Sequence, residues 1–323
     1  MGKKILLSGV KPTGRVHIGN YFGAMKQFVD FQDDYESRIM IADYHALTTV
    51  QDASVLKQDI LDLVASYLAI GLDPNRVIIF QQSAVAEHLE LAWIFNCLTT
   101  MPYLARAHAY KDALAKNKEV NVGVFTYPLL MAADILIYDP DVVPVGQDQK
   151  QHVEIARDVA EKFNRLFGEA FKLPEPFIPE DVKTVTGLDG QKMSKSYGNT
   201  IPLFANEKDL KRLVMTIVTD SKGETEPKNP EECHVFALHK LFSQVDLPEL
   251  KRRYVEGKIG YRESKEILAH NMNQYLKPMR EKYESLLSRP EEIKTVLAAG
   301  SERAQVIARA KLERVRELVG VKL

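Results

Sequence analysis

Short apolar runs alternate with amphipathic stretches through the first part of the chain. Runs typical of buried strands occupy residues 4–7, 38–42, 76–80 and 142–145, and helical periodicity follows at 21–32, 55–70, 87–99 and 148–167. This alternation predicts an α/β fold in which helices cover a parallel sheet. Ligands of such sheets bind beyond the carboxyl ends of the strands, where His17, Asp43, His45 and Gly146 are expected.

The strand pattern disappears after residue 201. Helical stretches follow at 206–218, 234–242, 247–257, 261–287 and 290–299, and residues 301–323 form a further amphipathic segment. We therefore expect three parts: an α/β domain at 1–200, a helical domain at 201–300 and a basic C-terminal helix at 301–323. Basic side chains outnumber acidic ones in that last segment. Its basic face either contacts phosphates or is an ordinary solvated surface. Residues 251–253 form a second, smaller basic patch.

The composition excludes several classes of protein. The chain has 323 residues and a net charge of −1, so any contact with nucleic acid must come from local patches. No apolar run is long enough to span a bilayer, and the apolar run after residue 4 is too short for a signal peptide. Cys97 and Cys233 are too few for a zinc site, and Cys97 is expected in the core. A cytoplasmic protein without a structural metal is predicted.

The first candidate motif is His-Ile-Gly-Asn at residues 17–20, directly before a predicted helix. A helix N-terminus presents unpaired N–H groups and a partial positive charge, so it can hold phosphate. Gly19 would let a nucleoside approach the backbone, and His17 could donate to an α-phosphate oxygen. The alternative is a simple helix cap with a surface histidine.

The second candidate motif is Lys-Met-Ser-Lys-Ser at residues 192–196, in a glycine-rich loop region. Lys192 and Lys195 could reach β- and γ-phosphates and neutralise a departing pyrophosphate. A solvated basic loop is the alternative. Together, the two motifs suggest that both segments close on one nucleoside triphosphate.

This pair of motifs resembles the signature of class I aminoacyl-tRNA synthetases. Three further segments are similar to the bacterial tryptophanyl branch of that family, and the similarity runs over essentially the whole chain, most strongly from residue 5 to 200. They are Ser-Gly-x-x-Pro-Thr-Gly at 8–14, Leu-Met-Ala-Ala-Asp-Ile-Leu at 130–136 and Val-Pro-Val-Gly-Gln-Asp-Gln-Lys-Gln-His at 143–152.

The resemblance implies a Rossmann-like catalytic domain followed by an all-helical domain that reads the anticodon. It further implies a ligase that forms tryptophanyl-adenylate from tryptophan and ATP, with Mg²⁺ on the ATP phosphates, and passes tryptophan to its tRNA. The family's enzymes are homodimers. No structural metal is expected.

The resemblance also implies site residues. The expected catalytic residues are Thr13, His17, Lys192, Ser194 and Lys195. The expected ATP-binding residues are Lys11, Pro12, Thr13, Gly19, Asn20, Gly146, Gln147, Asp148, Val185, Lys192, Met193, Ser194, Lys195 and Ser196. Asp148 is expected on the ribose hydroxyls.

Asp134 is the central residue of the expected amino-acid pocket. It lies in an otherwise apolar helix, where a carboxylate needs a partner. An indole N–H can only donate and an ionised carboxylate can only accept, so the two match. A lysine or arginine from elsewhere is the alternative partner. The full expected tryptophan-binding set is Leu7, His45, Met131, Asp134, Val143, Val145 and Gln149, of which the apolar members could equally be plain core.

Three positions differ from the usual bacterial pattern. Lys11 replaces a glutamine, Leu7 replaces an aromatic residue, and Ala113 replaces a lysine, for which Lys111 or Lys116 is the available substitute. These differences leave the reaction type intact. The other hypotheses are a tyrosine-specific counterpart, a catalytically idle RNA-binding relative and a simpler nucleotidyltransferase.

Overall fold

A five-stranded parallel sheet forms the centre of the computed structural model, which describes residues 2–115, 120–146, 149–177 and 184–322. The strands lie in the order β3-β2-β1-β4-β5. Their bounds are Lys4–Val10 (β1), Tyr35–Ile41 (β2), Ile78–Gln81 (β3), Val142–Pro144 (β4) and Glu175–Phe177 (β5). The predicted α/β fold with a parallel sheet is confirmed, and β5 is a strand that the sequence pattern did not predict.

The two faces of the sheet are covered by different helices. Alternate side chains of each strand point to opposite faces, so Leu6 and Leu7 belong to separate apolar clusters. One cluster includes α4 (Ala53–Ile70) and α13 (Tyr261–Leu287), and the other includes α5 (Glu87–Leu98), α8 (Val122–Leu136) and α9 (Lys150–Phe167). The remaining elements of this part are short. They are α1 (Ile18–Asn20), η1 (Tyr21–Met25), α2 (Lys26–Phe31), α3 (Asp43–Ala46), η2 (Gln82–Ala84), α6 (Met101–Leu104), α7 (His108–Ala115) and η4 (Lys195–Tyr197).

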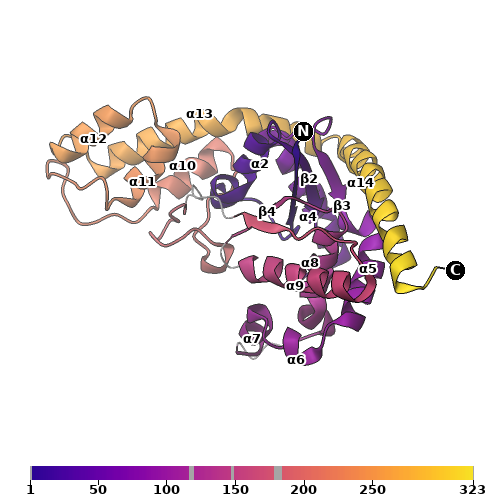
Figure 1. Cartoon of the computed structure of the whole chain (residues 1–323). Helices are drawn as coiled ribbons and strands as arrows, with labels where there is room; N and C mark the ends of the chain where they lie inside the picture. Colours follow the sequence, from indigo (N-terminus) through magenta and orange to yellow (C-terminus); the bar gives the residue numbers. More distant parts are fainter. Residues whose placement is uncertain (1, 116–119, 147–148, 178–183, 323) are drawn as a thin grey trace.

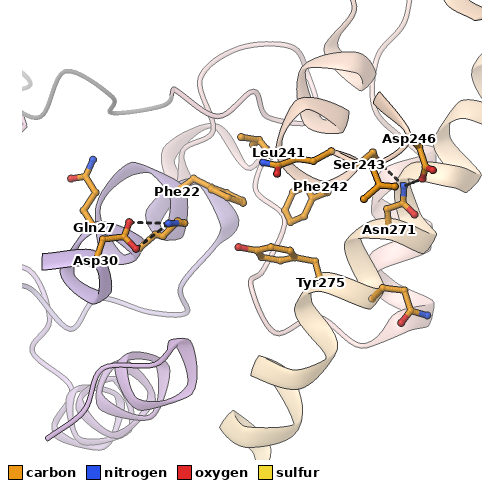
Figure 2. A pocket seen from close by; sticks show the side chains of 13 residues that line it. Phe22, Gln27, Asp30, Leu241, Phe242, Ser243, Asp246, Asn271 and Tyr275 are labelled. Carbon is orange, nitrogen blue, oxygen red and sulfur yellow. Dashed lines mark hydrogen bonds and ion pairs between the residues drawn. The ribbon is translucent and has the colours of Figure 1, made fainter. Parts of the chain in front are cut away.

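The C-terminal part is helical, as the sequence predicts. Helices α10 (Glu207–Met215), α11 (His234–Phe242) and α12 (Leu247–Val255) lie at one end of the molecule, and α13 leads from them back to the sheet (Figure 1). A groove of about 840 Å³ separates η1 and α2 from α11 and α13. Figure 2 shows Phe22 reaching from η1 toward Phe242 and Tyr275, whose rings join the two parts of the molecule.

The sequence prediction of two helices separated near residue 300 is wrong. One helix, α14 (Pro290–Val319), continues through that position and runs along the β3 edge of the sheet (Figure 1). Gly300 looks like a helix break in the sequence, yet it serves close packing: a Cβ there would lie 1.8 Å from the Ile79 carbonyl oxygen. The Ser301 hydroxyl also accepts a hydrogen bond from the Gln81 N–H at 3.2 Å.

The basic residues of α14 pair with acidic residues of the α/β part. Arg309 lies 2.9 Å from Glu87, Arg316 lies 2.5 Å from Glu90, and Lys311 pairs with Asp139. In the smaller basic patch at residues 251–253, every basic side chain likewise has a glutamate partner. Much of the basic charge that the sequence shows is therefore used within the molecule.

The prediction that Cys97 is a core thiol is wrong, because its side chain is exposed. Helix α5 buries the face that carries His88, Leu91 and Phe95, and it turns Leu89, Trp93 and Cys97 outward. Positions four apart lie on one face of a helix, so the apolar residues form two stripes that the sequence alone does not distinguish.

In the described part of the chain, no helix is both long and apolar enough to cross a membrane.

Candidate active site

The carboxyl ends of the strands bring the expected site residues to one edge of the sheet. The loop after β1 carries Lys11 and leads to His17, while His45 follows β2 and Gln82 follows β3. Asp43 links the segment after β2 to the segment after β3. Its carboxylate accepts hydrogen bonds from the Ser83 N–H at 3.0 Å and the Gln81 side-chain amide at 2.8 Å.

The second predicted phosphate-binding motif contacts the loop that leads into the first. The Lys195 ammonium donates to the Thr13 carbonyl at 2.6 Å and to the Gly14 carbonyl at 3.1 Å. The backbone joins the same segments, since the Ile18 N–H donates to Ile201 and the Leu203 N–H donates to Val16, both at 3.0 Å. Partial burial lowers the pKa of Lys195. The Lys195 side chain is otherwise exposed, so an incoming phosphate could replace the two carbonyl oxygens.

His17 caps the first helix, and it is buried rather than on the surface. Its Nδ1 accepts the Asn20 backbone N–H at 3.3 Å, while the His17 backbone N–H donates to the Asn20 side-chain oxygen at 3.1 Å. Burial, helped by the positive charge of Lys195, lowers the pKa of His17 to about 4. The ring is neutral at pH 7, and its proton must lie on Nε2 because Nδ1 accepts. That nitrogen is the one suited to donate to a phosphate oxygen.

The remaining predicted nucleotide contacts lie around these two segments. Met193 is 4 % exposed and anchors the loop through its N–H, which donates to the carbonyl of the buried Val185 at 2.8 Å. A Cβ at Gly19 would lie 3.3 Å from Met193, so the first helix and the loop approach closely here. The other predicted nucleotide-binding residues differ in their exposure to solvent. Pro12 is buried, Thr13 and Ser194 are half-buried, and the exposed ones are Lys11, Asn20, Gly146, Lys192 and Ser196. Gln147 and Asp148 lie outside the described residues.

Asp134, on α8, is 2 % exposed and is surrounded by hydrogen-bond donors. The His45 Nε2 lies 2.7 Å from one carboxylate oxygen, and the His88 Nδ1 lies 2.6 Å from the other. The Gln82 amide donates to both oxygens, at 2.8 and 2.9 Å. In the described part of the chain, these three side chains take the place of the lysine or arginine that the sequence offered as an alternative.

This arrangement keeps the Asp134 carboxylate ionised in a buried position. Burial acts to raise the pKa of Asp134, and the hydrogen bonds from His45 and His88 outweigh that effect and hold the pKa at about 2. An ionised carboxylate accepts hydrogen bonds only. Asp134 is therefore suited to receive a ligand N–H.

Apolar residues predicted for the pocket pack in the cluster that also contains α8. Leu7 and Val143 are buried, while Met131 and Val145 are partly buried against the same cluster.

A series of contacts also links this pocket to the segments expected to bind the nucleotide. The Lys11 ammonium lies 5.3 Å from the centre of the Tyr127 ring, and that ring lies 6.1 Å from His45. Gln149 is half-buried one residue before α9.

Sequence reasoning missed several residues of this site. Gln82 and His88 contact Asp134, and Tyr138 contacts His88 through its hydroxyl at 2.8 Å. Tyr127 also contacts His152, with 2.7 Å between the hydroxyl and Nε2. A histidine within the apolar pattern of residues 87–99 was the available signal for His88, because a buried imidazole needs a polar partner.

Comparisons with known proteins agree with this geometry. Residues 2–277 match the profile of the family described as tRNA synthetases class I (W and Y). A tryptophan–tRNA ligase of Fusobacterium nucleatum is 51 % identical over 98 % of this chain and 97 % of its own length, and one from Campylobacter jejuni is 47 % identical over 98 % and 99 %.

Solved structures show the same relationship. The crystal structure of Campylobacter jejuni tryptophanyl-tRNA synthetase, complexed with ADP and tryptophan, superposes with a TM-score of 0.93 at 47 % identity, covering 98 % of this chain and 99 % of that one. The Mycoplasma pneumoniae enzyme gives a TM-score of 0.82 at 29 % identity, covering 99 % and 98 %. The resemblance expected from the two motifs is confirmed.

Proposed function

Because this chain belongs to the class I tRNA synthetases of the tryptophan and tyrosine group, we propose that it attaches tryptophan to its tRNA at the expense of ATP. The contact of Lys195 with the Thr13–Gly14 backbone carries this proposal, since it brings the second signature motif to the loop that leads into the first. Identity of 51 % to a tryptophan–tRNA ligase, over nearly the full length of both chains, supports tryptophan as the amino acid.

The reaction has two steps. The carboxylate of tryptophan attacks the α-phosphorus of ATP, forming tryptophanyl-adenylate and releasing pyrophosphate. A hydroxyl of the terminal tRNA ribose then takes the tryptophanyl group and releases AMP. Neither step requires a covalent bond to the protein, so catalysis comes from positioning and from stabilisation of charge.

The nucleotide is held between the two motifs. His17 donates from Nε2 to the α-phosphate, and Lys192, Ser194 and Lys195 contact the departing pyrophosphate. ATP enters as its Mg²⁺ complex. Lys195 must release the two carbonyl oxygens it contacts now, and this release lets the loop close when phosphate arrives. Gly19 and Gly146 leave room beside the adenosine.

Tryptophan is recognised through its ring nitrogen. Asp134 accepts the indole N–H, and Leu7, Met131, Val143 and Val145 enclose the ring. Phenylalanine would leave the buried carboxylate without that partner, and such a loss can reject a competitor by roughly 10⁴-fold. We assign the ammonium group of the amino acid to Gln149, with His45 nearby.

We also propose that the protein works as a homodimer in the cytoplasm, with tRNA as its macromolecular substrate and residues 201–300 reading the anticodon. An exposed apolar stripe on α5 supports self-association: Leu89 is 43 % exposed, Trp93 is 70 % exposed, and Met101 beyond them is 71 % exposed. Trp93→Glu should convert a dimer into a monomer in sedimentation velocity. Leu166→Glu, another exposed apolar residue, is the control.

The activity is tested by exchange of labelled pyrophosphate into ATP, measured with tryptophan, tyrosine or phenylalanine. Exchange with tryptophan alone supports the proposal. Exchange with tyrosine would keep the fold and reaction and reject the proposed pocket. No exchange with any amino acid would favour an idle RNA-binding relative.

A further inference from the structure

His88 lies on the side of Asp134 away from solvent and is fully buried. Its Nδ1 is 2.6 Å from the Asp134 carboxylate, and its Nε2 is 2.8 Å from the Tyr138 hydroxyl. The imidazole therefore bridges the carboxylate and a phenol that lies outside the expected pocket.

The chemistry of the two neighbours fixes which ring nitrogen of His88 carries the proton. Asp134 is ionised and can only accept, so Nδ1 must donate to it. A neutral imidazole has a single N–H, and Nε2 must then accept the hydrogen bond of the Tyr138 hydroxyl. Burial, together with the negative charge of Asp134, raises the pKa of Tyr138, so the phenol keeps its proton.

Tyr138 itself is held firmly in place. It is 2 % exposed, and its ring packs edge-on against Phe80 with 5.3 Å between ring centres. The guanidinium of Arg38 lies 5.7 Å from the ring centre and donates to the Tyr138 carbonyl at 2.7 Å. The hydroxyl thus has little freedom, and as the partner of Nε2 it holds the His88 ring in place from the side opposite Asp134.

Three side chains hold both oxygens of Asp134. One contact comes from His45, one from His88 and two from the Gln82 amide, which spans both oxygens. The Gln82 amide cannot turn over without loss, because its oxygen accepts the Tyr44 N–H at 3.1 Å. The carboxylate is therefore fixed in orientation, and an indole N–H would share an oxygen with one of the two Gln82 contacts.

We propose that His88 is a positioning residue for tryptophan: anchored at Nε2 by Tyr138, it aims the Asp134 carboxylate at the indole N–H. This inference rests on the proposed function, and it assigns specificity to two residues that lie outside the expected pocket. Tyr138→Phe would leave Nε2 buried without a donor. The ring would then lose its second anchor, and its Nδ1–H would hold the carboxylate in a less defined orientation.

The test compares two amino acids that differ only at the ring nitrogen. Pyrophosphate exchange is measured with tryptophan and with its benzothiophene analogue, in which sulfur replaces the N–H. Tyr138→Phe should lower kcat/KM about tenfold for tryptophan, as expected for leaving a buried acceptor unpaired, and should leave the analogue almost unaffected. A purely structural role would lower both values equally, and that result would overturn the inference.

Tyr67→Phe is the matched control, because Tyr67 is also fully buried and its hydroxyl has no hydrogen-bond partner among the described residues. It should leave the ratio between the two amino acids unchanged. Thermal unfolding of each variant shows whether the fold is intact.

A second variant keeps the inference testable if Tyr138→Phe folds poorly. In His88→Asn, an amide N–H takes the place of Nδ1, and the ring nitrogen that contacts Tyr138 is absent. Adding Tyr138→Phe to this variant should then produce no further loss of preference for tryptophan, whereas equal losses in both backgrounds would refute action of Tyr138 through His88. Wild-type protein that shows no exchange with tryptophan would instead refute the proposed function.

Discussion

At the scale of single residues, burial and hydrogen bonding decide the charge state of each group in the site. Asp134 and His17 are both buried, and their pKa values both fall, to about 2 and about 4, for different reasons. Asp134 is held ionised because donors surround it, and His17 is held neutral because burial and Lys195 disfavour its cation. The site thus contains one fixed negative charge for an N–H donor and one neutral imidazole beside a lysine.

Asp134→Asn should lower kcat/KM for tryptophan by about 100-fold or more, because an amide N–H₂ would face protein donors and one acceptor would be lost. Pyrophosphate exchange measures this change, and the KM for ATP should change little. Asp52→Asn is the control, since Asp52 caps α4 with its side chain and asparagine caps helices equally well. Wild-type exchange by Asp134→Asn would exclude Asp134 from indole recognition.

Lys195→Met should lower kcat by about 100-fold, comparable to the loss of one group that stabilises transition-state charge. The KM for tryptophan should stay near the wild-type value, because the lysine contacts the nucleotide side of the site. Steady-state exchange kinetics separate the two constants. Lys211→Met, which alters an exposed lysine on α10, should have no effect. A change confined to the KM for tryptophan would contradict the assigned role.

At the scale of elements, α14 depends on a residue with no side chain. Gly300→Ala would place a methyl group against the Ile79 carbonyl, in the edge strand β3. Overpacking of this kind costs about 1–3 kcal/mol. We expect a lower urea midpoint for unfolding of the whole chain, because α14 contacts both β3 and α5.

Gly23→Ala is the control for this prediction. A methyl group at Gly23 would meet no atom within 4 Å, so its stability should be equal to wild type or slightly higher. Equal urea midpoints for Gly300→Ala and wild type would show that α14 can move away from the sheet at little cost.

At the scale of the whole molecule, stability should fall as the pH falls from about 6.5 to 4. Burial lowers the pKa of His239, in the helical part, from 6.5 to about 4, and His17 shows a similar shift. In this range the unfolded chain binds more protons than the folded one, so acid favours unfolding. One such histidine accounts for about 2 kcal/mol between pH 7.5 and 4.5.

Urea unfolding across that pH range measures the effect. His239→Gln should flatten the curve, because glutamine does not titrate and its amide can still donate to the Ser264 carbonyl that His239 contacts at 3.1 Å. His270→Gln is the control, since His270 is exposed. A curve as steep in His239→Gln as in wild type would show that other groups cause the acid sensitivity.

The sequence by itself determined the α/β architecture, the helical C-terminal part and the family. Apolar periodicity fixes which elements form, and the short motifs at 17–20 and 192–196 carry chemistry that few other residue patterns supply. The division into domains and the roles of the site residues remain predictions. Local patterns could also place Asp134 in an apolar helix, where a carboxylate requires partners.

Only the tertiary structure decided which partners those are. Gln82 and His88 meet Asp134, and Tyr138 meets His88, because β3, α5 and α8 pack together. No local pattern records contacts between such distant segments. The same reason explains why the predicted helix boundary near residue 300 and the predicted burial of Cys97 are wrong. Which stripe of a helix faces the core depends on the element packed against it, and that choice is made by the whole fold.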